Sequence, residues 1–161
     1  MKHLLAAFLL GTWCLAGMGV AQADKVISED AVLKAIEVFQ KDPSSAEGVA
    51  AASTIIAFAK TSDAVHISLS KAVAPWLKSQ DAPDADTRSM LLSAYVAGDV
   101  RSQLQSGKAG DDIYAGWQQV IATYDQLHQI NPTVKFPEID DLKAKEKTGT
   151  LRSYAAEVQK K

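Results

Sequence analysis

The stretch Met90–Leu127, MLLSAYVAGDVRSQLQSGKAGDDIYAGWQQVIATYDQL, decides the fold. Its apolar residues recur at spacings of three and four, the period of an α-helix with one buried face. Residues 106–111, in its middle, combine a helix stop signal, a glycine turn and an acidic start signal. We therefore predict two helices joined by a short turn. Their buried stripes are Leu91, Leu92, Tyr95, Val96, Val100 and Leu104, then Ile113, Trp117, Val120, Ile121, Tyr124 and Leu127.

Towards the N-terminus the same period predicts two further helices. Ser28 can cap the first, and Asp42-Pro43 ends it, because the residue before a proline avoids the helical region. The second helix starts at Pro43, with Asp42 or Ser44 as its cap. The stripe of the first helix is Val32, Ile36 and Phe39. The apolar and small residues of the second are Val49, Ala52, Ile55, Ile56 and Ala59.

The segment 62–78 allows two interpretations. The alternation of Val65, Ile67 and Leu69 would suit a strand, but no second strand is available nearby to pair with it. We therefore predict a third helix here. Pro75 predicts that this helix bends or ends near Ala74, since proline has no amide hydrogen to donate. The helical stripe is Val65, Leu69, Val73 and Trp76.

Prolines, a candidate cap and an apolar stripe predict two short helices in the C-terminal part of the chain. The helix that contains Leu127 stops at Asn131-Pro132, and Pro137 opens the next one. Thr150 is the candidate cap of the last helix. The stripe of that helix is Leu151, Tyr154, Ala155 and Val158. The sequence thus predicts a single all-α domain over residues 24–161, with five to seven antiparallel helices in hairpins, as a helical bundle or a short solenoid.

Helix pairs followed by a proline, as at Pro43 and Pro132, resemble tetratricopeptide-type repeats. The resemblance covers one helix pair, in which Tyr124 alone matches the small and aromatic positions of the repeat. The chain shows no self-similarity at the period of about 34 residues that such repeats have. The resemblance therefore implies only an architecture of stacked helix pairs, and no family is assigned from it.

The first residues are typical of a cleaved secretory signal peptide. Lys2 supplies a positive start, an apolar run follows, and Ala21-Gln22-Ala23 has small residues where signal peptidase needs them. An uncleaved membrane anchor is the alternative, because the apolar run is about 20 residues long. Three glycines within the run favour cleavage after Ala23. We therefore predict a signal peptide over residues 1–23 and a periplasmic or secreted mature protein of bacterial type.

Composition excludes several classes of function. Cys14, the only cysteine, lies within the signal peptide, so the mature chain can form neither a disulfide nor a thiolate metal site. Cleavage removes Lys2 and leaves 16 basic and 19 acidic residues, a net charge of −3. Such a mild balance argues against nucleic acid or an anionic membrane as the main partner.

Motifs for catalysis are few. The mature chain has two histidines, His66 and His128, and neither has the spacing to a second ligand that a metal site needs. No serine stands in a Gly-x-Ser-x-Gly nucleophile motif, and no cofactor loop is present. Histidine is nevertheless the side chain best suited to proton transfer near neutral pH. A small periplasmic hydrolase that uses His128 or His66 with a nearby acid is therefore the alternative function.

The leading interpretation is a non-catalytic module that binds a periplasmic protein or peptide. Stacked helix hairpins leave grooves that commonly accept helices or extended peptides. Aromatic side chains of the central helix pair are the candidate apolar anchors, and acids beside them are the candidate polar rim. The anchors are Tyr95, Tyr114 and Trp117, and the rim is Asp99, Asp111 and Asp112. If these aromatic residues belong to the core instead, they should be nearly buried.

The signal-peptide interpretation predicts the N-terminus of the mature protein. We expect Asp24 to be the first residue of protein recovered from a producing bacterium, because cleavage follows Ala23. N-terminal sequencing or intact mass spectrometry of the recovered protein measures this directly. Protein that retains Met1–Ala23, or that stays with the membrane after a salt wash, would contradict the prediction.

Overall fold

A computed structural model describes residues 26–78 and 85–160 of the chain. The predicted signal peptide, residues 1–23, lies outside the described residues. The described part contains helices and no strand, which confirms the all-α prediction. The elements are α1 (Glu29–Lys41), α2 (Ala46–Thr61), the 3-10 helix η1 (Pro75–Lys78), α3 (Ala85–Ser106), α4 (Ile113–Ile130), α5 (Pro137–Lys147) and α6 (Leu151–Val158).

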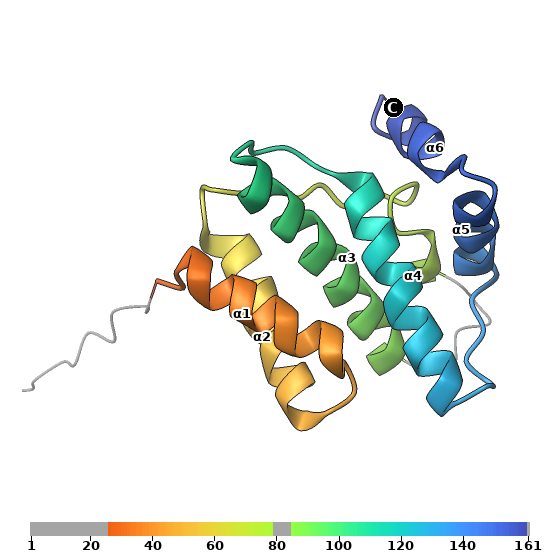
Figure 1. The fold of residues 1–161 in the computed structure, drawn as a ribbon, viewed down its shortest axis with the longest axis horizontal. Helices are drawn as coiled ribbons and strands as arrows, with labels where there is room; N and C mark the ends of the chain where they lie inside the picture. The colour runs from red at the N-terminus through yellow and green to blue at the C-terminus, as the bar shows by residue number, and fades with distance from the viewer. Residues whose placement is uncertain (1–25, 79–84, 161) are drawn as a thin grey trace, which may run out of the picture.

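Two antiparallel hairpins, α1–α2 and α3–α4, form the main body, and α5 and α6 pack along the outer side of α4 (Figure 1). The predicted turn between α3 and α4 is present, with Gly107 at a φ of 64°, a conformation that glycine adopts without strain. Helices α2 and α3 are neighbours but run in the same direction (Figure 1). This parallel arrangement is possible because a long segment, 62–84, separates them along the chain.

The helix starts follow the predicted capping chemistry at one site and depart from it at another. Ser28 caps α1, since its Oγ accepts a hydrogen bond from the Ala31 amide at 3.2 Å. Helix α2, however, is capped by Ser45, whose Oγ accepts from the Gly48 amide at 3.0 Å. The carboxylate of Asp42 accepts from the amides of residues 44 and 45 instead. Asp42 thus closes a turn before α2, and Pro43 lies in that turn and not in the helix.

The third predicted helix is wrong. Residues 62–74 are not helical, and only Pro75–Lys78 form a single 3-10 turn. Its backbone finds partners elsewhere: the side chain of Gln103 accepts from the amide of His66 and donates to its carbonyl, both at 2.8 Å. Periodicity could not reveal this, because the partner lies 37 residues away in the sequence.

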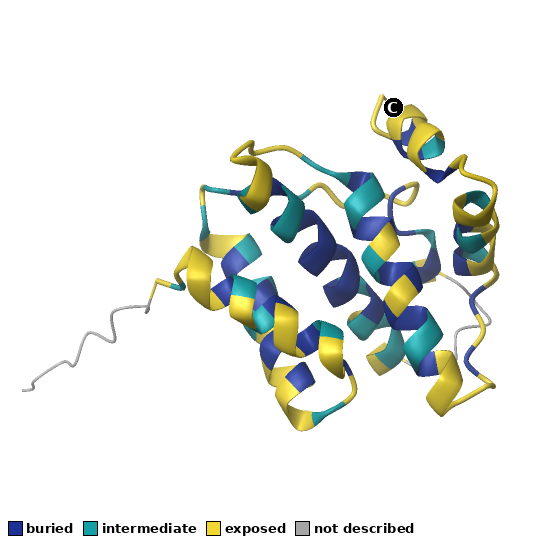
Figure 2. Cartoon of the chain, in the orientation of Figure 1, coloured by how far each residue is buried: buried dark blue, intermediate teal, exposed yellow. Residues whose placement is uncertain are grey.

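Figure 2 shows the buried residues on the faces that the helices turn toward one another. The stripe Val32, Ile36 and Phe39 is fully buried, as predicted. In α2 the inner face differs from the prediction, because Phe58 and Ala51 point into the core while Val49 is 52% exposed. Helix α2 is apolar on more than one face, so its period alone could not identify the inner one.

Glycines set how closely α3 and α4 approach. A Cβ atom added at Gly98 would lie 2.4 Å from the carbonyl oxygen of Ala115, and one added at Gly116 would lie 2.4 Å from the ring of Tyr95. Both distances are far below van der Waals contact. Gly98 therefore allows the backbones of α3 and α4 to meet, and Gly116 leaves room for the ring of Tyr95.

The burial of Trp117 predicts a large loss of stability on truncation. Its side chain is fully buried, stacks on Tyr154 with 5.3 Å between ring centroids, and donates from Nε1 to the Val73 carbonyl at 2.7 Å. We expect Trp117→Ala to lower the free energy of unfolding by about 3–5 kcal/mol. Urea denaturation followed by circular dichroism measures it. Ile130→Ala, at a largely exposed position, should change it by less than about 0.5 kcal/mol; a loss below about 1 kcal/mol in Trp117→Ala would contradict the packing described here.

Candidate functional site

Three of the predicted site residues belong to the core. Tyr95, Trp117 and Asp99 are all fully buried, so they cannot anchor or rim a ligand at the surface. Tyr95 packs its ring against Gly116, and Trp117 lies under α6. The expectation that these three residues line an exposed groove is therefore corrected. The reason is that the α3–α4 contact uses the same face that carries them.

The other three predicted residues reach the surface but already have partners. The Arg152 guanidinium lies over the ring of Tyr114, 3.9 Å from its centroid, and the Tyr114 hydroxyl accepts from Gln118 at 2.9 Å. Asp112 caps α4 through the Ala115 amide at 3.0 Å. The Asp111 carboxylate accepts from the amide of residue 68 at 2.6 Å. Each has a structural role in the α3–α4 end of the molecule.

Gln103 and Asp99 form a buried network beneath that end. Gln103 makes two bonds to the backbone of His66, accepts from the Gly110 amide at 2.9 Å and donates to Asp99 Oδ1 at 2.8 Å. The same oxygen of Asp99 accepts from the Asp112 amide at 2.8 Å. One side-chain pair thus ties the segment 62–74 and the α3–α4 loop to helix α3.

The other oxygen of this carboxylate lacks a partner. Asp99 Oδ2, the Tyr95 hydroxyl and Trp76 Nε1 are buried without a hydrogen bond in the described part of the chain. Burial raises the pKa of Asp99 to about 6, although bonds from the Asp112 amide and Gln103 act in the opposite direction. Burial, together with the charge of Asp99, also raises the pKa of Tyr95. The fold therefore favours the neutral form of Asp99 more than water does.

A polar groove of about 370 Å³ lies over the α3–α4 contact and reaches α1. Its floor is made by Gly98 and Ala115, where the two backbones meet. Its walls are polar side chains. Together the lining residues are Gln40, Gly98, Arg101, Ser102, Gln105, Ala115, Gln118 and Gln119.

Several wall groups of this polar groove are free to bind a ligand. Arg101 and Gln105 make no side-chain hydrogen bond or ion pair within the described residues. Gln118 uses its amide nitrogen to bond Tyr114, which leaves its carbonyl oxygen available. Carboxamides offer a donor and an acceptor together, and a guanidinium offers a donor fork. These groups suit peptide bonds and a carboxylate.

A second hollow, of about 700 Å³, lies between α2 and α3 and is mainly apolar. It shares no lining residue with the polar groove. Val49, Ile56 and Met90 contribute its largest apolar side chains. The two hollows are therefore separate surfaces with different chemistry.

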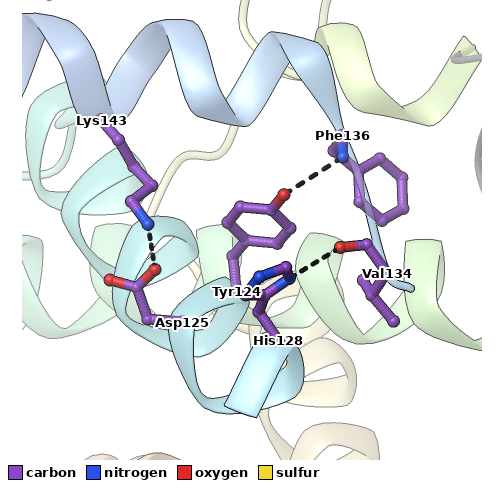
Figure 3. Close-up of polar contacts among 6 residues, drawn as sticks. All are labelled: Tyr124, Asp125, His128, Val134, Phe136 and Lys143. Atoms are coloured by element: carbon purple, nitrogen blue, oxygen red, sulfur yellow. Dashed lines mark hydrogen bonds and ion pairs between the residues drawn. The ribbon is translucent and has the colours of Figure 1, made fainter. Parts of the chain in front are cut away.

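His128 has a structural role in the loop before α5. Its Nδ1 donates to the carbonyl of Val134 at 3.0 Å, and beside it the Tyr124 hydroxyl accepts from the Phe136 amide at 3.3 Å (Figure 3). An ion pair between Asp125 and Lys143 holds α5 to α4 on the other side of Tyr124 (Figure 3). These contacts join α5 to α4, and none of them brings an acid to His128.

His66 does not form a catalytic triad. Its Nε2 lies 3.2 Å from the hydroxyl of Ser68, but Asp111 bonds the amide of Ser68 and not the second ring nitrogen of His66. Neither histidine lines either hollow. The described residues contain no group of three or more His, Cys, Asp or Glu side chains placed to hold a metal ion.

The polar groove residues were not among those predicted from sequence. Arg101 and the glutamines come from three helices, and the one signal available was the density of glutamine on the outer faces of the 90–127 hairpin. Among the described helices, none is long and apolar enough to cross a membrane. Comparisons with family models, with curated proteins and with solved structures found no match for this chain.

The buried Asp99 predicts an unusual dependence of stability on pH. Its pKa is about 6 in the folded protein against 3.8 for a free side chain, so the folded state binds the extra proton. Its contribution to stability is therefore full below about pH 4 and is lost as the pH rises through about 6, at a cost of roughly 3 kcal/mol.

Replacing Asp99 with its neutral isostere should remove this cost. We expect Asp99→Asn to match the wild type in free energy of unfolding near pH 4 and to exceed it at pH 7.5. Urea titrations at several pH values measure the difference, and Asp141→Asn, at an exposed acid of α5, serves as the control. A variant that is less stable than the wild type at pH 7.5 would show that its surroundings stabilise the ionised carboxylate and would contradict the prediction.

Proposed function

We propose that this protein is an exported, non-catalytic binding module that holds an extended segment of another protein or a peptide in the polar groove over α3 and α4. The observation that carries the proposal is the pair of unpaired polar side chains, Arg101 and Gln105, on the walls of that groove. Both side chains are at least partly open to solvent, so a ligand can take the place of the water that bonds them.

The chemistry of the walls indicates the kind of ligand. The carboxamides of Gln105 and Gln118 can each bond a peptide group, so a main chain fits better than an apolar side chain. Arg101 can hold a carboxylate through two parallel hydrogen bonds. The floor at Gly98 and Ala115 carries no long side chain that would cover it. We infer an extended peptide with at least one acidic side chain or a free C-terminus that faces Arg101.

Two residues expected from sequence to contact the ligand retain a part in this proposal. Tyr114 positions Gln118 through its hydroxyl, and Asp112 holds Ser102 at 2.6 Å between carboxylate and hydroxyl. Both would act by fixing the groove walls. The hydrolase alternative has no comparable support, since neither histidine contacts an acid in the described part of the chain.

A random peptide display library tests the proposal. We expect the mature protein to recover peptides enriched in Asp and Glu, and Arg101→Gln to weaken binding of a recovered peptide at least tenfold, or about 1.4 kcal/mol. Lys34→Gln is the matched control, because it removes one positive charge from an exposed position of α1 outside the groove. Fluorescence anisotropy with a labelled recovered peptide gives the dissociation constants.

Two outcomes would contradict the proposal. One is a library that yields no peptide above background. The other is a recovered peptide that binds Arg101→Gln and wild type equally, since that peptide would occupy another surface. Circular dichroism of each variant confirms that its helices are intact before its binding is interpreted.

A further inference from the structure

The apolar hollow between α2 and α3 is a surface that the proposed function does not use. It lies along most of α2 and the first turns of α3. Val49 at its edge is 52% exposed. Its lining residues are Pro43, Val49, Ala52, Ser53, Ile56, Ala57, Lys60, Asp86, Ser89, Met90 and Ser93.

The hydroxyl groups in this hollow are already bonded to their own helices. Ser53 donates to the Val49 carbonyl at 3.2 Å, Ser89 to the Ala85 carbonyl at 2.9 Å, and Ser93 to the Ser89 carbonyl at 3.0 Å. Each hydroxyl hydrogen is therefore unavailable to a ligand. The hollow offers apolar contact and close approach at small residues, but few hydrogen bonds.

Two opposite charges stand at the two ends of the hollow. Lys60 is in the last turn of α2, and Asp86 is in the first turn of α3. Because α2 and α3 run in the same direction, these turns lie at opposite ends (Figure 1). Both side chains are exposed, and neither makes an ion pair within the described residues. The occupant should thus be apolar along its length and carry complementary charges at its two ends.

We propose that a second copy of this chain occupies the hollow, in a two-fold symmetric dimer. Helix α2 of each copy lies antiparallel along the groove of the other, so that Lys60 of each copy faces Asp86 of the partner subunit. A two-fold interface requires a surface complementary to itself. A cation at one end and an anion at the other meet this requirement when the helices are antiparallel.

The shape of α2 fits the same arrangement. Val49 and Ile56, seven positions apart, form a ridge, while Ala52 and Ala57 leave room between turns for the ridge of a partner helix. The polar groove remains open in such a dimer, because the two hollows share no residue. The dimer would therefore present two peptide-binding grooves and could bind a divalent partner more tightly than either groove alone.

Sedimentation velocity of the mature protein at low salt, from about 1 to about 500 µM, tests the dimer. We expect a reversible monomer–dimer equilibrium in the wild type. Lys60→Glu and Asp86→Lys should each raise the dimer dissociation constant about tenfold, because each change places like charges together twice in a two-fold interface. The double variant Lys60→Glu/Asp86→Lys restores both pairs with the charges exchanged, and it should dimerise like the wild type.

An apolar position provides the second test. Val49→Asp should abolish the dimer, whereas Val38→Asp, at a similarly exposed valine of α1 outside the hollow, should leave it unchanged. Circular dichroism checks that both variants fold. A wild type that stays monomeric at the highest concentration would overturn the proposal, as would a dimer that survives Val49→Asp. Failure of the double variant to recover dimerisation would overturn the antiparallel two-fold arrangement. Peptide binding measured with Arg101→Gln is independent of all these outcomes.

Discussion

The side chain of Gln103 joins two irregular segments of this protein, residues 62–74 and the α3–α4 loop, to helix α3. Its carboxamide makes four hydrogen bonds inside the protein, to the amide and carbonyl of His66, to the Gly110 amide and to Asp99. A buried amide is stable only when its donors and acceptor are satisfied. Here the bonds to His66 and Gly110 also fix irregular backbone, while the fourth bond joins Gln103 to Asp99 within α3. Together with the Asp111 bond to the amide of residue 68 and the Trp117 bond to the Val73 carbonyl, these bonds fix the 62–74 segment that connects α2 to the rest of the chain.

Asp99 extends this network at an energetic cost. It binds Gln103 and the α3–α4 loop through one oxygen, but its second oxygen is buried without a partner. An ionised carboxylate in this place is unfavourable, which is why burial raises its pKa. Asp99 and the loop before α4 are thus linked through the hydrogen bond from the Asp112 amide. The network that orders the α3–α4 end of the protein therefore also responds to the protonation of Asp99.

The two proposed binding surfaces follow from two different modes of helix packing. Gly98 allows the backbone of α3 to meet that of α4 at Ala115, and polar side chains flank this contact on both sides. Helices α2 and α3 lie side by side without a short connecting loop, and a hollow remains between them. The first surface is rich in amides and the second is apolar. A peptide ligand and a second subunit are therefore expected at different places on the molecule.

The sequence by itself determined most of the helices. Periodic apolar residues together with Ser28, Pro137 and Asn131-Pro132 located α1, α4 and α5, because a helix of one amphipathic face needs only local spacing and local caps. It also placed Trp117 on the inner face of its helix. These are properties of short stretches of chain, and the folded protein retained them.

Tertiary structure alone decided the path of residues 62–74 and the composition of the polar groove. The segment around Val65 had the spacing of a helix, but its backbone bonds to Gln103 replaced the helical ones. Tyr95 and Trp117 could have served a groove or a core equally well, because the same apolar rings suit both, and the contact between α3 and α4 buried them. Arg101 and the glutamines of the polar groove become neighbours only when α1, α3 and α4 pack together. No spacing along the chain could therefore have predicted that they share a surface.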